Sequence, residues 1–259
     1  MKYEVKACEI LEKDELAPGI FRFWVAAGEL AHRAQPGQFA NFLVPGKTLR
    51  RPISICEIDR ERGALCFVME VRGEGTKCLS EFAVGDSFDL LAPLGNGFTL
   101  GDVTRRALFV GGGIGTPPLL EAAKAFGNRA TVALGFRNRG AAILMEEFEA
   151  AGCRVLVATD DGSLGHHGLV TDLLGGVDAD VVFACGPMPM LRTVSQLAQE
   201  RGIPCQVSLE ERMACGIGAC LGCACAVHRA APDGTMGQTY GHVCKDGPVF
   251  DSRTVSFAP

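Results

Sequence analysis

The sequence has little of what marks nucleic-acid-binding, membrane or secreted proteins. Its 25 Lys and Arg are outnumbered by 30 Asp and Glu, and no basic stripe with interleaved aromatic residues occurs. The apolar runs are strand-sized and interrupted by glycine, and residues 1–16 are too charged for a signal segment. These absences predict a protein that binds neither nucleic acid nor a membrane.

Groups suited to acid–base catalysis are also scarce. The chain has five histidines, and no histidine or carboxylate pair has a spacing that suggests proton transfer. His166 and His167 are adjacent in a glycine-rich stretch, where polar loop residues are the ordinary interpretation. The sequence therefore predicts no catalytic side chain.

Cysteine, in contrast, is abundant and clustered. Five of the twelve cysteines lie between residues 215 and 244, and four of these follow the spacing C-x4-C-x2-C…C: Cys215, Cys220, Cys223 and Cys244. This is the plant-type pattern that holds a 2Fe–2S cluster on four thiolates. Glycines between the first three cysteines would let the backbone approach a cluster closely.

Two other interpretations of these cysteines stay open. Structural zinc usually takes two separate C-x2–4-C pairs, whereas here one loop supplies three ligands. Disulfides are rare where there is no secretory signal, and so many cysteines indicate a reducing compartment, the cytoplasm. Cys225 is a spare thiol that either replaces Cys223 as a ligand or packs as a small side chain. The scattered cysteines are predicted to be small core residues: Cys8, Cys56, Cys66, Cys78, Cys153 and Cys205.

Periodicity divides the chain into three predicted domains. Residues 1–101 contain six β-rich runs separated by turn residues, which predicts a small antiparallel barrel, with a short helix at 78–85. Residues 102–209 alternate strands with helices, including helices at 141–152 and 169–176, which predicts a parallel sheet. Residues 210–259 have few periodic runs and hold the clustered cysteines, so a metal would stabilise a piece too small for its own core.

Two motifs in the second predicted domain suggest nucleotide binding. A glycine loop follows the first strand and opens a helix; its candidate residues are Gly111, Gly113, Gly115 and Thr116. Such a loop lets the backbone approach a diphosphate at a helix N-terminus, although it is also a common tight turn. Cys185 and Gly186 end a later strand, at the sheet edge where ligands bind, or form a simple glycine–proline turn.

A further pair of motifs lies in the predicted barrel. Residues 51–54 read RPIS, where an Arg51 fork would suit a diphosphate and a Ser54 hydroxyl the edge of a flavin ring. Gly75 and Thr76, in GEGT, offer backbone N–H groups to the same phosphates. From the residues alone, an arginine on a solvated strand edge is the better interpretation.

Taken in order, RPIS, GEGT, PLGNGF, GGGIGTPP, ACGPMPM and CGIGACLGC with HVCKDGPVF resemble the ferredoxin-reductase superfamily with a C-terminal cluster, and within it the electron-transfer subunits of type B dihydroorotate dehydrogenases. The resemblance covers nearly the whole chain. It implies a multi-domain β plus α/β fold: an FAD-binding barrel, an NAD-binding parallel-sheet domain and a small 2Fe–2S domain. One departure is a long insert at residues 228–242.

The resemblance also implies site residues. FAD would contact these residues of the barrel: Arg51, Pro52, Ile53, Ser54, Val68, Met69, Glu70, Gly75 and Thr76. The glycine loop with Cys185 and Gly186 would hold the nicotinamide nucleotide, and the four clustered cysteines would hold the 2Fe–2S cluster. NAD rather than NADP is expected from the resemblance, although Arg137 and Arg139 are placed where they could meet a 2′-phosphate.

The implied partner is an FMN-containing subunit that oxidises dihydroorotate in pyrimidine synthesis, in a heterotetramer of two subunits of each kind. Electrons would pass from FMN through the cluster and FAD to NAD⁺. Two alternatives remain: a related reductase subunit serving a hydrogenase, a glutamate synthase or a ferredoxin, and a zinc-stabilised nucleotide-binding regulator without electron transfer.

Overall fold

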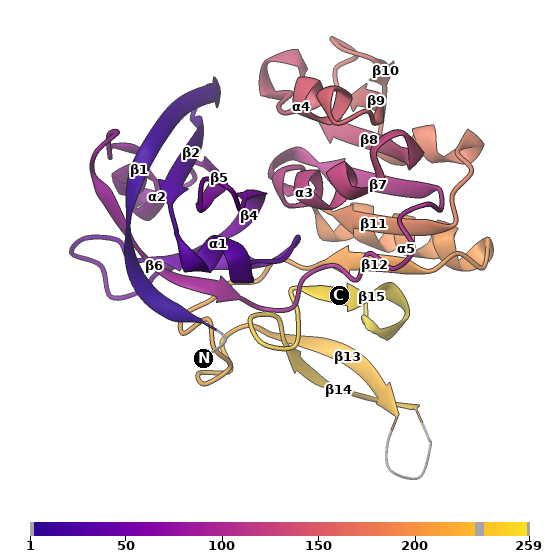
Figure 1. The fold of residues 1–259 in the computed structure, drawn as a ribbon. Helices are drawn as coiled ribbons and strands as arrows, with labels where there is room; N and C mark the ends of the chain where they lie inside the picture. Colours follow the sequence, from indigo (N-terminus) through magenta and orange to yellow (C-terminus); the bar gives the residue numbers. More distant parts are fainter. Residues whose placement is uncertain (1–2, 231–235, 258–259) are drawn as a thin grey trace.

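The computed structural model describes residues 3–230 and 236–257, which form a barrel, a parallel sheet and a C-terminal hairpin (Figure 1). The barrel is closed in the order β1-β2-β5-β4-β3-β6. Its strands are β1 Glu4–Ala17, β2 Ile20–Ala26, β3 Phe39–Phe42, β4 Arg51–Asp59, β5 Ala64–Glu70 and β6 Ser87–Leu94. All neighbouring strands in it run antiparallel, as the sequence predicted.

Aromatic rings fill the barrel. Phe42 meets Phe67 and Phe88 edge to face, with ring centroids 5.0 and 5.1 Å apart, and Phe23 meets Phe88 at 5.2 Å. These four rings are almost completely buried. Alternation along each strand directs them inward, and edge-to-face pairs add stability beyond the area that they bury.

Two short helices accompany the barrel: α1 Glu29–Arg33 and α2 Glu74–Ser80. The helix predicted at 78–85 was placed too late, because α2 starts inside GEGT and ends at Ser80. Thr76 Oγ1 accepts the backbone N–H of Arg72 at 2.9 Å and that of Gly73 at 3.3 Å. These bonds satisfy donors at the start of the helix, and so fix where it begins.

The second part is a sheet in the order β10-β9-β8-β7-β11-β12-β15, parallel except for its last strand. Its strands are β7 Ala107–Gly112, β8 Ala130–Phe136, β9 Arg154–Thr159, β10 His166–His167, β11 Val181–Cys185, β12 Cys205–Ser208 and β15 Val249–Asp251. The α-helices are α3 Pro117–Phe126, α4 Met145–Ala150 and α5 Met188–Glu200. The short 3-10 helices are η1 Gly113–Gly115, η2 Gly127–Arg129, η3 Arg139–Ala141, η4 Val170–Gly176 and η5 Ser252–Thr254.

Two predicted helices of this part are shorter or tighter than expected. The helix predicted at 141–152 is reduced to α4, and that at 169–176 is the 3-10 helix η4. Leu144 precedes α4 with a φ of 62°, a conformation that interrupts a helix. Gly175 and Gly176, at the end of η4, disfavour longer helix.

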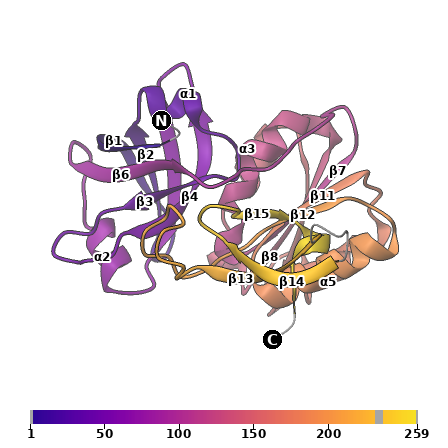
Figure 2. The same ribbon diagram turned by 90° about the horizontal axis from the view of Figure 1, so that it is seen from below.

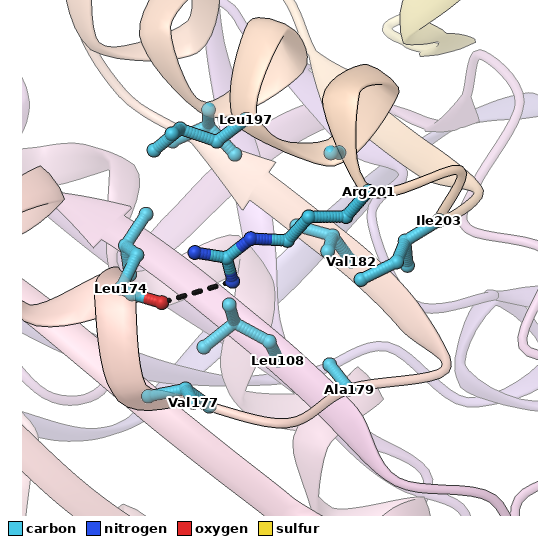
Figure 3. A pocket seen from close by; sticks show the side chains of 10 residues that line it. Leu108, Leu174, Val177, Ala179, Val182, Leu197, Arg201 and Ile203 are labelled. Atoms are coloured by element: carbon cyan, nitrogen blue, oxygen red, sulfur yellow. Dashed lines mark hydrogen bonds between the residues drawn. The ribbon is translucent and has the colours of Figure 1, made fainter.

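The helix α5 packs over η4 and the sheet, as Figure 3 shows at close range. Arg201 Nη1 donates to the carbonyl oxygen of Leu174 at 3.0 Å, which ties the end of α5 to η4. The apolar hollow beneath has a volume of about 10 Å³, at the limit for a single water. This part of the structure is therefore packed core and no ligand site.

The C-terminal part consists of the hairpin β13 Ala224–Ala230 and β14 Met236–His242, followed by β15. The hairpin runs beneath the sheet, as the two views show (Figures 1 and 2). Most of the predicted insert lies in these two strands, and its residues 231–235 lie outside the described residues. Because β15 pairs with β12, the chain beyond the cysteines returns to the parallel sheet.

Candidate cluster, flavin and nucleotide sites

The four clustered cysteines form two pairs that differ in burial. Cys223 and Cys244 are each 2% exposed and lie in the apolar core shared with the sheet, whereas Cys220 is exposed. Cys215 shares a hydrogen bond with the Cys220 thiol, and Cys244 shares one with Cys223. One pair thus faces the protein interior and the other faces outward.

Backbone N–H groups converge on these sulfurs. Gly218 N–H donates to Cys244 Sγ at 3.1 Å, Ala219 N–H to Cys215 Sγ at 3.3 Å, and Cys244 N–H to Cys223 Sγ at 3.4 Å. Gly216 and Gly218 reach these positions with φ near 73° and 81°, values open to glycine at little cost.

The half-buried Cys215 thiol and the buried Cys244 thiol differ in pKa, because hydrogen bonds and burial act on them to different extents. Burial opposes ionisation of Cys215, but the backbone N–H groups of Ile217, Cys220 and Ala219 outweigh it and lower the pKa to about 6. Burial, followed by the hydrogen bond and charge of Cys223, raises the pKa of Cys244 to about 12.

The donor set fits a 2Fe–2S cluster. The two pairs of thiols match two irons with two protein ligands each. The backbone N–H groups that point at the sulfurs are the hydrogen-bond donors that stabilise a negatively charged cluster. The predicted C-x4-C-x2-C loop and the distant Cys244 are thus brought together, while Cys225 is half-buried at the start of β13 and remains the spare thiol.

A cleft with a volume of about 230 Å³ lies where the barrel, the parallel sheet and the chain leading to Cys215 meet. Most residues predicted to contact FAD line it, from β4, β5 and α2: Pro52, Ile53, Ser54, Val68, Met69, Glu70 and Thr76. Arg51 and Gly75 are adjacent, since a Cβ on Gly75 would lie 2.5 Å from Arg51 Nε. A mostly apolar cleft bordered by an arginine fork and a helix start fits a flavin with its diphosphate.

The glycine loop and the Cys185 turn meet at one point of the sheet. From β7 the chain continues outward through β8 and β9 on one side and returns on the other side as β11 and β12. The crevice outside β7 and β11 is therefore a topological switch point, where nucleotides bind in such sheets. A Cβ on Gly115 would lie 2.4 Å from the Cys185 carbonyl oxygen, so only glycine permits this approach.

Other observations at this point also fit a bound nucleotide. Within the described residues, the buried Thr116 Oγ1 has no hydrogen-bond partner, and it lies at the start of α3. Burial, with a contribution from the charge of Glu210, raises the pKa of Cys185, so this thiol stays neutral. Gly113 and Gly186 complete the two loops, and the cleft reaches them through Ile114 and Cys185.

Several cleft residues were not predicted from the sequence. The largest group lies at the end of β12 and directly after it: Ser208, Leu209, Glu210, Glu211 and Met213. The rule that ligands bind outside the carboxyl ends of parallel strands could have identified them. Phe39 lies in β3, Arg72 between β5 and α2, and Pro248 directly before β15, and no pattern within the sequence relates the three.

Arg139, considered for a 2′-phosphate, is engaged elsewhere. Its Nε donates to the Ser163 carbonyl oxygen at 3.2 Å, and its N–H donates to Ser163 Oγ at 2.8 Å. His166 and His167, expected to be polar loop residues, are exposed but form the short edge strand β10, and His166 Nε2 lies 3.4 Å from Asp172 Oδ2. No helix among the described residues has the length and apolarity needed to cross a membrane.

Comparisons with known proteins agree with this geometry. A family model described as the iron–sulfur cluster binding domain of dihydroorotate dehydrogenase B matches residues 210–256. The electron transfer subunit of dihydroorotate dehydrogenase B (NAD⁺) from Caldanaerobacter subterraneus subsp. tengcongensis is 40% identical over 99% of this chain and 100% of its own length. The subunit of the same name from Geobacillus kaustophilus is 45% identical over 85% of this chain and 86% of its own.

Solved structures show the same fold. A chain of the NADH-dependent reduced ferredoxin–NADP oxidoreductase is 31% identical, with a TM-score of 0.83 over 97% of this chain and 90% of that one. The ferredoxin reductase of carbazole 1,9a-dioxygenase is 20% identical, with a TM-score of 0.65 over 78% of this chain and 67% of that one. The predicted ferredoxin-reductase-like fold is thus confirmed, and the chain belongs to the family of electron transfer subunits of NAD⁺-dependent dihydroorotate dehydrogenase B.

Proposed function

We propose that this protein transfers electrons between an FMN-containing catalytic subunit, which oxidises dihydroorotate to orotate, and NAD⁺. It would do so in the cytoplasm, as a heterotetramer with two subunits of each kind. The main support for this proposal is that the cysteine loop borders the cleft where the barrel and the sheet meet, because Met213, two residues before Cys215, lines that cleft. A cluster, a flavin and a nucleotide would therefore lie in succession.

The chain's own residues would bind and orient the cofactors. Bound FAD would supply two-electron exchange with a nicotinamide and one-electron exchange with a 2Fe–2S cluster. Arg51 would bind the diphosphate, and Ser54 would hydrogen-bond the ring edge. Val68 and Met69 are almost fully buried and would keep water from the ring.

The switch point would position the nicotinamide against the flavin, which is the main requirement of hydride transfer. Gly111, Gly113 and Gly115 would let the diphosphate of the nucleotide approach the protein backbone. The buried Thr116 hydroxyl, which has no hydrogen-bond partner among the described residues, would hydrogen-bond to the nucleotide. We assign no side chain to proton transfer, because the bound nicotinamide and flavin would themselves supply the hydride exchange.

The test starts with the chain purified anaerobically, alone and with its co-purifying partner. We expect FAD, two irons and two sulfides per chain, and bleaching of the flavin and cluster absorption by NADH. Dihydroorotate turnover should require the FMN subunit. Replacement of Cys220 or Cys223 by serine should remove the cluster signal, while Cys153→Ser, at a buried cysteine away from the loop, should keep it. A colourless chain that binds zinc, or dihydroorotate turnover by the isolated chain, would refute the proposal.

The resemblance to the NADH-dependent reduced ferredoxin–NADP oxidoreductase favours a second candidate, a reductase subunit with a ferredoxin-type partner. The cofactors of this chain would be the same, so the partner decides between the two. Co-purification with an FMN subunit that oxidises dihydroorotate supports the first proposal, and a partner carrying only iron–sulfur clusters supports the second.

A further inference from the structure

Two asparagines of the barrel reach the chain segments at Cys215 and Cys244, the first and last of the four cluster cysteines in the sequence. Asn96 follows β6, and its Nδ2 donates to the carbonyl oxygens of Lys245 and Asp246, each at 3.0 Å. These are the two residues after Cys244. The backbone N–H of Asn96 also donates to the Gly247 carbonyl oxygen at 2.6 Å.

Asn41 contacts the other segment from inside the protein. It lies in β3 with no exposed surface, and its Nδ2 donates to the Ala214 carbonyl oxygen at 3.5 Å, immediately before Cys215. Its Oδ1 has no hydrogen-bond partner within the described residues. A buried amide this poorly satisfied costs stability, which a role other than packing would explain.

A glycine with a positive φ lies at each contact, Gly216 on the cysteine segment beside Asn41 and Gly95 on the barrel directly before Asn96. A Cβ on Gly216 would lie 2.8 Å from Asn41 Nδ2, and a Cβ on Gly95 would lie 2.7 Å from the Gly247 carbonyl oxygen. The barrel and the cysteine segments thus touch at two points, each with an asparagine amide and a glycine.

The strand β3 also connects these contacts to the flavin site. Asn41 is paired with Pro52 of β4, one of the residues that line the cleft. Neither asparagine lines the cleft itself. The two amides are therefore placed to fix the cysteine segments relative to the barrel without contacting a flavin.

We propose that Asn41 and Asn96 are positioning residues that hold the two cysteine segments on the barrel, and so set the environment of the cluster and its separation from the flavin. The inference rests on the proposed function, because it takes the four cysteines to hold a cluster. Loss of either amide would free one segment to shift, which would alter cluster retention and the hydrogen bonds that tune its potential.

The test compares Asn41→Leu, Asn96→Ala and their double variant in the full chain purified anaerobically. The control is Asn128→Ala, which removes an exposed amide in η2. We expect unchanged FAD content and, in each single variant, a shifted cluster midpoint potential, a changed electron paramagnetic resonance line shape, and iron loss to a chelator about fivefold faster, as the loss of one hydrogen bond implies. Asn96→Gln keeps the donor at an exposed site and should restore part of the wild-type behaviour.

The possible results distinguish a failed positioning role from a failed proposed function. If the wild-type chain holds a cluster but both single variants match Asn128→Ala in potential, line shape and iron loss, the positioning role is wrong and the proposed function stands. If the wild-type chain holds no cluster, both the proposed function and the positioning role of the two asparagines are wrong. If Asn41→Leu does not fold, the exposed Asn96→Ala variant still decides the matter.

Discussion

Leu221 occupies a backbone conformation that leucine rarely adopts. Its φ is 60°, and its side chain is 60% exposed directly beside Cys220. The left-handed conformation costs a non-glycine residue roughly 1–2 kcal/mol, and an apolar side chain exposed to water gains no burial energy in return. Ile217, on the other side of Cys220, is also exposed. Both features are explained if the partner subunit covers this loop.

Replacement of Leu221 by glycine separates folding from assembly. Glycine relieves the strained φ but loses more entropy on folding, so the free energy of unfolding should change by less than about 1 kcal/mol. Affinity for the partner subunit should fall about tenfold or more, because burial of a leucine contributes about 1.5–3 kcal/mol. Urea unfolding and a binding titration measure the two effects. Leu169→Gly, at an exposed leucine on the far edge of the sheet, should leave partner affinity unchanged.

Among individual residues, the sequence predicted the candidate ligands best where they lie close together in the chain. The spacing of Cys215, Cys220 and Cys223 specified a cluster loop because three of its ligands are local. The roles of Asn41 and Asn96 depend on contacts with residues about 150 or more positions away, so no sequence pattern reveals them. The assignments of individual FAD and nucleotide contacts stay predictions.

Between the elements β4 and α3, charged groups lie at the boundary of barrel and sheet. Lys124 of α3 forms an ion pair with Glu57 of β4, whose side chain is 11% exposed. The Cys56 and Cys66 sulfurs and a Glu57 oxygen lie within 4.8 Å of one another. Lys124 already engages this carboxylate, and burial raises the pKa of Cys56 well above its usual value. The prediction that Cys56 and Cys66 are small core residues therefore agrees with their surroundings.

The Lys124–Glu57 pair should be costly to break from one side. Lys124→Met leaves a buried carboxylate without its partner and should lower the free energy of unfolding by about 3 kcal/mol. The double variant Lys124→Met, Glu57→Leu should recover to within about 1 kcal/mol of wild type, since an apolar pair replaces the ion pair. Urea unfolding of wild type, Lys124→Met, Glu57→Leu and the double variant gives the coupling energy. A double variant no more stable than Lys124→Met would contradict this account.

Glu121, on the same face of α3, should make stability depend on pH. Burial raises its pKa above the unfolded value, despite the hydrogen bond from the Ile58 N–H at 3.1 Å. Its contribution to stability is therefore present below the unfolded pKa and is lost as the pH rises through the folded pKa. Glu121→Gln keeps an acceptor for Ile58, so its stability relative to wild type should increase as the pH rises through and above the ordinary pKa range of a glutamate. Glu149→Gln, at an exposed carboxylate, should show no such trend.

The predicted helices and strands differ from those in the structure mainly in where they begin and end. The six barrel strands were predicted because β-rich runs alternate with strong turn residues. The helix at 78–85 was misplaced because hydroxyl bonds within GEGT start α2 earlier, and η4 is a 3-10 helix because its last residues are glycines. The strands β13 and β15 are short or irregular in pattern, and their partners come from distant positions.

For the whole molecule, Phe250 connects the cysteine segment to the parallel sheet. It pairs with Val207 through β15 and β12, and a Cβ on Gly247 would lie 2.2 Å from its ring. The predicted boundary at 209 and 210 therefore lies in a continuously packed region, although the boundaries themselves stay predictions. Folding of the sheet and of the cysteine segment should be coupled.

Phe250→Ala tests this coupling. The loss of a buried ring should lower the free energy of unfolding by about 3 kcal/mol and should also accelerate iron loss from the cluster. Urea unfolding followed by both circular dichroism and cluster absorption should give coincident transitions. Phe257→Ala, at a partly buried ring near the chain end, serves as the control. Cluster loss well before the unfolding of the sheet would show that the two parts are independent.

The outward-facing position of Cys220 has a consequence for the life of the protein before assembly. With one thiolate pair in the core and the other at the surface, dissolved oxygen would reach a cluster from one side only. The catalytic subunit, once docked on that side, would act as a shield as well as an electron source. Free subunits should accordingly bleach in air faster than the assembled enzyme, and cells would benefit from producing the two chains together.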